Sequence, residues 1–415
     1  MREQQTQHFV GLDIGTSTVR CVVGTADPDD PSKAAIVGHG SAPNEGMRKG
    51  IVAHIDDVAE AISQALTEAE RVSGFSIRAA TININGAHVG GINSKGVIAI
   101  STANREITDD DRLRSEEAAT IVNLPPNREI LQVFAKNYRV DGQDNIKDPV
   151  GMHGVRLEVD THIVTAATPN VKSLEMALEK SHVSIAHRTV SSLAAAEAVL
   201  NRQQKEAGTL LIDIGAGTTN LVVIEDGEVQ YVGVIPTGGI HLTNDLAIGL
   251  KTDLDVAERV KLQHADLTDK RKSDKVKVKV NKKEYVFDSE EIAMITEARL
   301  EELFELVQRE LKRINKSQRL PGGVVLVGGT AKIPGISDFA KDKLQLAARK
   351  GVWQPIGGLI DTIADVTYTT AVGLMLLDMY LLPQGHYNRH AGKANDKVFG
   401  ALDSVWKRIK GRPNS

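Results

Sequence analysis

Two stretches of the chain share one pattern of apolar and polar positions. In the first, an apolar run leads into the turn at residues 13–18, which reads DIGTST, and a second apolar run follows. In the second stretch, residues 210–212 lead into the turn at residues 213–220, which reads DIGAGTTN. Short apolar runs bounded by glycine-containing turns predict buried strands. Each stretch therefore predicts a strand, a tight turn and a second strand.

The two stretches lie two hundred residues apart and match at six of twelve positions, Asp13 and Asp213 among them. An acid at the end of a strand can hold a hydrated Mg²⁺, and small residues in the turn let backbone N–H groups reach phosphate oxygens. One such turn alone is equally consistent with an ordinary strand end. Two copies at a domain-sized separation predict two similar lobes that face one nucleotide.

Between these turns the periodicity predicts the rest of one lobe and an insert. Apolar positions at helical spacing predict a helix over 55–72 that packs on strands at 9–14, 19–24 and 35–39. The pattern changes near residue 81. A strand at 79–84, a strand at 96–101, a helix over 108–122 with a capping box from Thr108 to Asp111, and strands at 129–140 and 156–165 predict a βαββ-like insert.

The second half of the chain also predicts a mixture of helices and strands. Helices are expected over 171–181, 192–200, 240–249, 253–264, 289–314 and 364–382. Gly238 and Gly239 open one of them, where free N–H groups would suit a phosphate, although a plain helix N-cap would look the same. The strand at 275–280 alternates lysine with valine, which favours an edge strand protected against aggregation over a docking site. A glycine turn at 327–331 follows a buried strand, where open α/β sheets bind ligands.

The last residues differ from everything before them. Residues 383–396 are polar and predict a flexible tether. On a helical wheel, the next residues separate into an apolar arc and a polar side that carries basic residues. A core-packing helix is the alternative, but the position after a tether favours a helix that lies in a membrane interface. The arc holds Val398, Phe399, Leu402, Val405, Trp406 and Ile409, and the basic residues include Lys407, Arg408 and Lys410.

Composition narrows the class of protein. The 415 residues are 41% hydrophobic and 25% charged, as in an ordinary globular protein, and the net charge of −4 excludes bulk attraction to nucleic acid. The single cysteine, Cys21, excludes a disulfide within the chain and predicts a buried, inert thiol. The first ten residues lack the apolar region of a signal peptide, and the longest apolar run is shorter than a membrane span. A cytosolic protein is expected.

The turns, the glycine pair and the stretch VVLVGGTAKIPGI at 324–336 resemble the superfamily of actin, sugar kinases and DnaK-type chaperones. Together with the insert and the terminal amphipathic pattern, they are similar to the FtsA family of bacterial cell-division proteins. This resemblance implies an α/β, actin-like ATPase fold with two lobes around a nucleotide cleft and an inserted, SHS2-like subdomain IC. The implied divisions are IA at 1–80 and 166–207, IC at 81–165, IIA at 208–250 and 320–363, IIB at 251–319, the closing helix of IA at 364–382, the tether at 383–396, and a membrane-targeting helix at 397–411.

The same resemblance implies ATP and Mg²⁺ as ligands and no catalytic residue. Asp13 and Asp213 would hold the metal. The nucleotide would lie on Gly15, Thr16, Ser17 and Thr18 in the first turn; on Gly215, Ala216, Gly217, Thr218 and Thr219 in the second; and on Gly238, Gly239, Glu258, Lys261, Gly328, Gly329 and Thr330.

Three positions depart from the family's common pattern. Thr18 stands where many relatives carry lysine, which removes a positive charge from the first turn. Asn220 stands where the second turn often ends in aspartate, and Ser191 stands at a position that is usually glutamate or glutamine. Because that last position orients the attacking water in actin-like enzymes, weak or absent hydrolysis is expected.

As a member of this family, the chain would polymerise on the cytoplasmic membrane, anchor FtsZ filaments there and recruit later cell-division proteins. It would be a peripheral membrane protein at the division site, without a nucleic-acid partner. The nearest alternative is an actin-like pilus-assembly protein of the PilM type, which usually lacks a terminal membrane helix. A small-molecule kinase would need a catalytic aspartate, and a chaperone ATPase would need a large β-rich domain after the ATPase unit.

Overall fold

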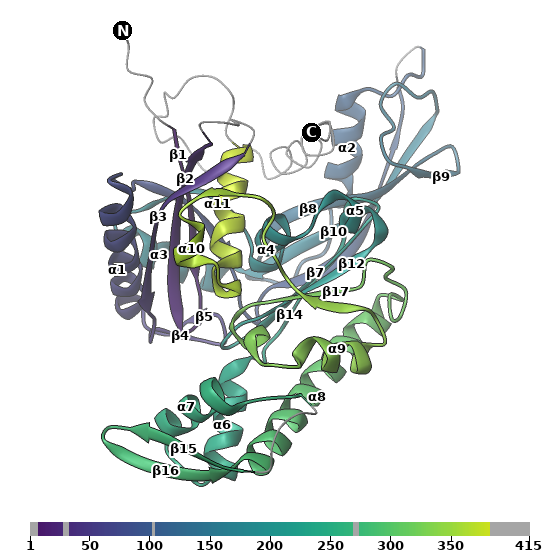
Figure 1. Ribbon diagram of the computed structural model, residues 1–415. Helices are drawn as coiled ribbons and strands as arrows, with labels where there is room; N and C mark the ends of the chain where they lie inside the picture. The colour runs from purple at the N-terminus through teal and green to yellow at the C-terminus, as the bar shows by residue number, and fades with distance from the viewer. Residues whose placement is uncertain (1–6, 28–32, 102–103, 269–273, 382–415) are drawn as a thin grey trace.

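The computed structural model describes residues 7–27, 33–101, 104–268 and 274–381. These residues form two lobes, each built on a mixed β-sheet, an inserted subdomain beside them, and a helical subdomain at the far end of the second lobe (Figure 1). The expected tether and membrane helix, including Trp406, lie outside the described residues. No helix within the described ranges has the length and apolar character needed to cross a membrane.

The sheet of lobe I has the strand order β11-β6-β1-β2-β3-β19. Strands β1, β2 and β3 form an antiparallel meander. Strand β6 pairs in parallel with β1, and β11 pairs in parallel with β6. Helices α1 and α3 cover one face of this sheet, and α4 and α11 pack on the other. The bounds are His8–Ile14 (β1), Thr18–Ala26 (β2), Ala34–Pro43 (β3), Met47–Arg48 (β4), Ile51–Val52 (β5), Ile55–Ser73 (α1), Ala79–Ile84 (β6), Thr168–Lys180 (α3), Ser184–Val190 (β11), Ser191–Val199 (α4), Gly357–Gly358 (β19) and Thr369–Leu381 (α11).

Lobe II repeats the central part of this arrangement. Its sheet has the order β14-β13-β12-β17-β18, in which β12 pairs antiparallel with β13 and parallel with β17. In lobe I, β1 pairs in the same two ways with β2 and β6. The duplication that the sequence predicts is therefore confirmed at the level of the sheet. The bounds are Arg202–Ala207 (α5), Thr209–Ile214 (β12), Thr219–Glu225 (β13), Glu228–Ile235 (β14), Val324–Val327 (β17), Gly329–Lys332 (η1), Ile336–Leu344 (α9) and Ala348–Lys350 (β18).

The insert has its own four-stranded sheet, ordered β7-β10-β8-β9, with α2 packed on one face. The predicted capping box is present, because Thr108 and Asp111 exchange hydrogen bonds at the start of α2. The strand at 79–84, expected to open the insert, instead pairs with β1 in lobe I. The bounds are Gly90–Ala99 (β7), Asp109–Ala119 (α2), Arg128–Val140 (β8), Gln143–Ile146 (β9) and Arg156–Ala167 (β10).

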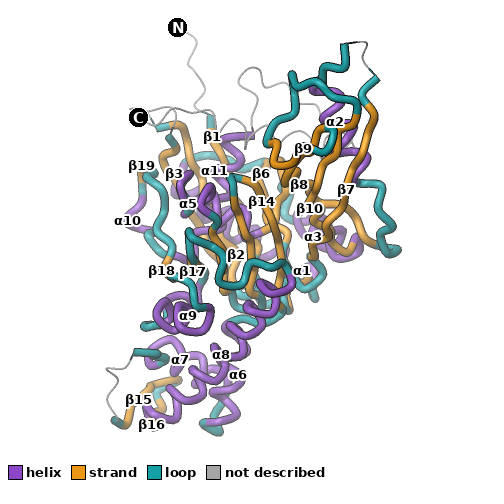
Figure 2. Tube along the Cα trace, turned by 90° about the vertical axis from the view of Figure 1, so that its right-hand side faces the viewer, coloured by secondary structure: helices purple, strands orange, loops and turns teal. Residues whose placement is uncertain are grey.

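The helical subdomain at the end of lobe II holds α6, α7, α8 and one hairpin (Figure 2). In β15, Val278 is buried and the lysines on either side are exposed, which confirms the two-faced pattern of that strand. The bounds are Gly239–Gly249 (α6), Leu254–His264 (α7), Lys275–Val280 (β15), Lys283–Asp288 (β16) and Ser289–Arg313 (α8).

One helix is shorter than the sequence predicts. The helix expected over 364–382 begins only at Thr369, after the short turns Ile360–Ile363 (α10) and Val366–Tyr368 (η2). The side chain of Asp365 accepts a hydrogen bond from Thr367 N at 2.9 Å. This hydrogen bond caps the short turn η2 and competes with a helix that would continue from residue 364. The helix α11 therefore begins only at Thr369.

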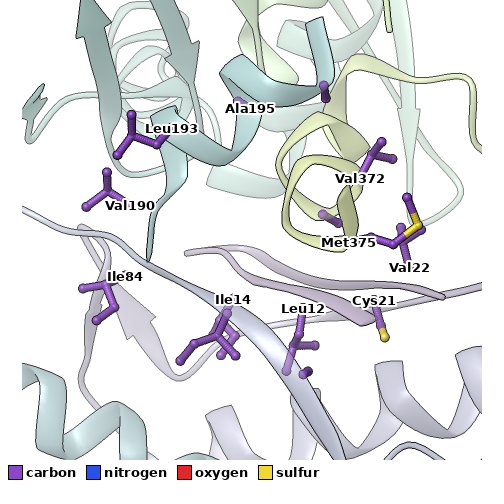
Figure 3. Packing of buried hydrophobic residues seen from close by; sticks show 14 of the residues in the cluster. Leu12, Ile14, Cys21, Val22, Ile84, Val190, Leu193, Ala195, Val372 and Met375 are labelled. Carbon is purple, nitrogen blue, oxygen red and sulfur yellow. The ribbon is translucent and has the colours of Figure 1, made fainter. Parts of the chain in front are cut away.

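The core of lobe I fills both faces of its sheet, with α4 and α11 packed on one face and α1 on the other (Figure 3). Cys21 is fully buried there, which confirms the prediction of a buried thiol, and burial raises the pKa of this thiol far above its usual range. The backbone of α11 lies directly against β1 on one side and against α4 on the other. A Cβ added to Gly11 of β1 would lie 2.1 Å from Ala371 O, and one added to Gly373 would lie 1.7 Å from Ala194 O of α4.

This close approach makes Gly373→Ala a test of the packing. The added methyl must separate α4 from α11, so we expect a loss of about 3 kcal/mol in the free energy of unfolding, measured by urea denaturation. Gly90→Ala serves as the control, because its Cβ would meet only Arg128 at an ordinary contact distance of 3.5 Å. Equal stability of the two variants would contradict this account of the helix packing.

Candidate functional site

The two duplicated turns close with the same hydrogen bond. Gly15 N donates to Thr18 O at 3.1 Å in the first, and Gly215 N donates to Thr218 O at 2.9 Å in the second. Each turn connects the two strands of an antiparallel hairpin. The sequence match therefore reflects the same backbone geometry in both lobes.

The two turns face each other across the boundary between the lobes. A Cβ added to Gly217 would lie 2.9 Å from the side chain of Thr16, so only glycine fits between the turns. The hydroxyl of Thr218 donates to Asn85 Oδ1 at 3.2 Å, which joins the second turn to the segment after β6. The structure thus brings the two predicted phosphate loops together.

The glycine pair at the start of α6 lies against the second turn. Gly239 N donates to Gly215 O at 2.9 Å, and Ile240 N donates to Ala216 O at 2.8 Å. The prediction of free N–H groups at this helix start was therefore wrong, because the second turn already accepts from them. The glycines serve close approach instead, since a Cβ on Gly238 would lie 2.6 Å from Gly215 O.

The residues expected on the adenosine side converge on the same helix start. A Cβ on Gly239 would lie 2.8 Å from Thr330 Oγ1 and 3.5 Å from Lys261 Nζ. Lys261 Nζ donates to Glu258 Oε2 at 2.6 Å and to Gly239 O at 3.2 Å. Gly328, with φ of 85°, opens the turn that carries Thr330. These residues thus form one continuous surface with the second turn.

Asp13 and Asp213 are both buried at the ends of their strands, 9% and 8% exposed. Burial raises the pKa of Asp13 to about 7 and that of Asp213 to about 6. The charge of Asp213 raises the pKa of Asp13 further, and the charge of Arg20 lowers both pKa values. Two buried carboxyls whose charges repel one another favour a bound cation.

The donor set fits Mg²⁺ bound together with a nucleotide. The described residues contain no group of three or more His, Cys, Asp and Glu side chains that would form a complete metal cage. Mg²⁺ is commonly held by one or two carboxylates, with water and phosphate oxygens completing the octahedron. Asp13 and Asp213 supply that number of carboxylates.

Arg20 is a charged residue beside the candidate site that sequence reasoning missed. It stands opposite Asp13 in the β1–β2 register, and its guanidinium lies 5.5 Å from the centre of the Tyr368 ring. Thr18 was taken to remove a positive charge from this region, but Arg20 supplies one two residues later. The period of two along β2 was the available signal, because residues 18 and 20 lie on the same side of a strand.

The region beside the turns is tightly packed. A cavity of about 10 Å³, enough for one water, is lined by Asn83, Asn85 and His88 among others. A groove of about 700 Å³ lies elsewhere, between the insert sheet and the β13–β14 hairpin, and its lining is polar. No residue that the sequence analysis singled out lines this groove, so its volume does not mark the nucleotide site.

Comparisons with known proteins cover nearly all of this fold. A family model described as "SHS2 domain inserted in FTSA" matches residues 86–165, and one described as "Cell division protein FtsA" matches residues 210–373. The FtsA of Bacillus subtilis is 38% identical over 372 residues, covering 88% of this chain and 82% of that protein. The FtsA of Pseudomonas aeruginosa is 34% identical over 90% of this chain and 89% of its own length. For the FtsA of Borreliella burgdorferi, the identity is 34% and the coverage 97% of both.

Solved structures bear on the fold alone. The PilM-PilN type IV pilus biogenesis complex contains a chain that matches with a TM-score of 0.64 at 18% identity, covering 89% of this chain and 98% of that one. MreB5 of Spiroplasma citri bound to ADP matches with a TM-score of 0.53 at 14% identity, covering 90% and 96%. The predicted actin-like ATPase fold with an SHS2-type insert is confirmed. With sequence matches over most of its length, the chain belongs to the FtsA family of cell-division proteins.

Proposed function

We propose that this chain binds ATP with Mg²⁺ between its two lobes, polymerises on the cytoplasmic face of the membrane, anchors FtsZ filaments there and recruits later division proteins. The observation that carries the nucleotide part is the meeting of the two duplicated turns, with Gly217 against Thr16. MreB5, a distant relative in fold, is a protein whose structure was solved with ADP bound. Membership of the FtsA family supports the role in division.

In this proposal both lobes contribute residues to the nucleotide site. The first and second turns would hold the phosphates through backbone N–H groups, and Asp13 and Asp213 would hold the metal. Thr330, Lys261 and Glu258, which converge on Gly239, would lie beside the sugar and base. Because Ser191 offers no carboxylate or carboxamide to orient a water, we propose slow hydrolysis or none.

The membrane part of the proposal rests on the sequence of residues 397–410. Their apolar arc and basic residues are typical of helices that lie in a membrane interface. The match to the Borreliella burgdorferi relative covers 97% of this chain, so it extends into residues 382–415. A helix of this size binds weakly alone, and a polymer that carries many copies would bind firmly.

The FtsZ contact is proposed on the helical subdomain, where α8 has an exposed charged face. Glu305 and Arg309 form a solvent-exposed pair there, with side chains 61% and 68% exposed. The buried side of the same helix, which includes Phe304 and Val307, holds the subdomain together. Reversal of charges on the exposed face should therefore leave the subdomain folded, with the loss of the exposed ion pair between Glu301 and Lys343 of α9.

Co-flotation with anionic vesicles tests this function. FtsZ should float only when this chain is present, and Glu301→Lys combined with Glu305→Lys should reduce the floating FtsZ about tenfold while the chain itself still floats. Glu117→Lys, a single reversal of an exposed acid on α2 of the insert, is the control and should float FtsZ normally. Normal co-flotation with the double variant would place the FtsZ contact elsewhere. Failure of FtsZ to float with the unchanged chain would contradict the anchoring function.

A further inference from the structure

Asn83 is a buried polar residue that the sequence analysis did not assign to the site. It is 1% exposed and stands near the end of β6. Because β6 runs parallel to β1, with Leu12 level with Ile82, Asn83 lies level with Asp13. A carboxamide at this position is next to the proposed metal ligand of lobe I.

The carboxamide of Asn83 donates hydrogen bonds through its nitrogen and accepts one through its oxygen. Its Nδ2 donates to Asp13 Oδ1 at 2.7 Å and to Ser191 Oγ at 3.0 Å. Its Oδ1 accepts from Ile14 N at 2.7 Å, just before the first turn. The one amide therefore fixes the carboxylate of Asp13, the backbone of the first turn and the start of α4.

The second lobe has no equivalent of this residue. The strand that matches β6 is β17, where Val327 stands level with Asp213 and the next residue is Gly328. Within the part of the chain that the structure describes, the side-chain donors to Asp213 are more distant: Asn220 Nδ2 at 3.4 Å and Thr370 Oγ1 at 3.5 Å. The carboxylate of Asp13 is thus held more tightly than that of Asp213.

We propose that Asn83 is a positioning residue for the metal in the nucleotide site, because it holds Asp13 in the orientation that receives Mg²⁺. This inference rests on the proposed binding of ATP·Mg²⁺. Among the described residues, Asn83 is the only side chain that donates a hydrogen bond to Asp13. Without it, the carboxylate would be free to turn away from the metal. Mg²⁺-dependent affinity for ATP should therefore depend on Asn83, while affinity without Mg²⁺ should not.

Two substitutions separate the two ends of the amide. Asn83→Asp keeps an oxygen that can accept from Ile14 N but removes the donor to Asp13. Asn83→Ala removes both. Calorimetry at pH 8 gives the ratio of the ATP dissociation constants in EDTA and in excess Mg²⁺. We expect this ratio to fall at least tenfold in Asn83→Ala, while the constant in EDTA changes less than twofold. In Asn83→Asp the lost donor lowers the ratio and the added carboxylate offsets part of that loss, so its ratio should lie between those of Asn83→Ala and the unchanged chain.

A control removes a buried carboxamide of the insert that bonds to lobe I. Gln132 is 3% exposed and donates to Thr189 Oγ1 at 3.1 Å, and Thr189 is the β11 neighbour of Asn83. Gln132→Leu should lower the melting temperature and leave the Mg²⁺ ratio unchanged. In an Asp13→Asn background, Asn83→Ala should change the ratio no further.

The calorimetry separates failure of the positioning role from failure of the proposed nucleotide site. A wild-type ratio in both Asn83 variants would overturn the positioning role alone. So would an equal weakening of ATP binding with and without Mg²⁺, because a merely structural role predicts that pattern. If the unchanged chain has no measurable affinity for ATP under either condition, the proposed nucleotide site fails and the role of Asn83 fails with it.

Discussion

The chain carrying Trp406→Glu should lose binding to anionic vesicles in a co-sedimentation assay, while its affinity for ATP stays at the wild-type level. Trp406 lies within the apolar arc of residues 397–410, between Leu402 and Phe399 on the helical wheel. A carboxylate there would have to enter the apolar part of the interface or withdraw the whole arc from it. Either cost is several times the modest net affinity of one helix.

The size of the effect follows from the free-energy contributions to membrane binding. Burial of six apolar side chains contributes about 1 kcal/mol or more each. Each nearby basic residue adds up to about 1 kcal/mol on an anionic surface. Ordering the helix costs about 1 kcal/mol or more per residue, which cancels much of this gain. The remainder for one copy is small, so the loss of one large aromatic and the gain of one charge should abolish binding.

Ser404→Glu is the matched control, because it introduces the same charge on the polar side of the same helical wheel. It should weaken vesicle binding slightly through repulsion and leave most of it intact. A chain that ends at Leu382 should behave like Trp406→Glu. Wild-type co-sedimentation of Trp406→Glu would rule out this segment as the anchor and favour an attachment elsewhere.

Most elements of the fold could be predicted because their signals are local. The hairpin around Asp213, the helix over 55–72 and the capping box at Thr108 each depend on residues close in sequence. The structure has β12 and β13, Ile55–Ser73 and Asp109–Ala119 at these places. The family resemblance then supplied the arrangement of lobes and insert, which periodicity alone does not give.

What could not be predicted depends on contacts between distant residues. The strand β6 reads the same whether it pairs within the insert or with β1, and only the three-dimensional pairing decides. The amides of Gly239 and Ile240 looked free because their acceptors, Gly215 and Ala216, lie in another element. A helix start in sequence shows its donors but never shows which distant carbonyl accepts from them.

The site shows the same limit. Asp13 and Asp213 were found because each follows an apolar run and precedes a glycine, a local pattern. Arg20 and Asn83 were not found, because an arginine in a strand and an asparagine near a strand end are usually exposed or in turns. Their roles follow from the registers of β1 with β2 and with β6. Sequence patterns point to candidate ligands more readily than to the residues that would position them.

Asp213→Ala should remove most of the Mg²⁺-dependent part of ATP affinity, at least tenfold in calorimetry, and leave binding in EDTA nearly unchanged. Asp213 is 8% exposed and is one of only two acids proposed for the metal. A divalent cation that loses one of two carboxylates must replace it with water, which removes a full charge from a buried site. Asp110→Ala, an exposed acid on α2, is the control. Wild-type Mg²⁺ dependence in Asp213→Ala would contradict the metal assignment.

The raised pKa values add a pH dependence with a definite sign. Without metal, the pKa of Asp13 is about 7 and that of Asp213 about 6, so both bind protons at pH values where a solvated aspartate is ionised. Since Mg²⁺ requires the carboxylates, its binding must release these protons. Affinity for ATP·Mg²⁺ should therefore rise about tenfold from pH 6 to pH 8. The nucleotide also titrates in this range, so Asp13→Asn is the reference, and it should show a clearly smaller rise. An equal rise in both proteins would mean that the carboxyl of Asp13 takes no part.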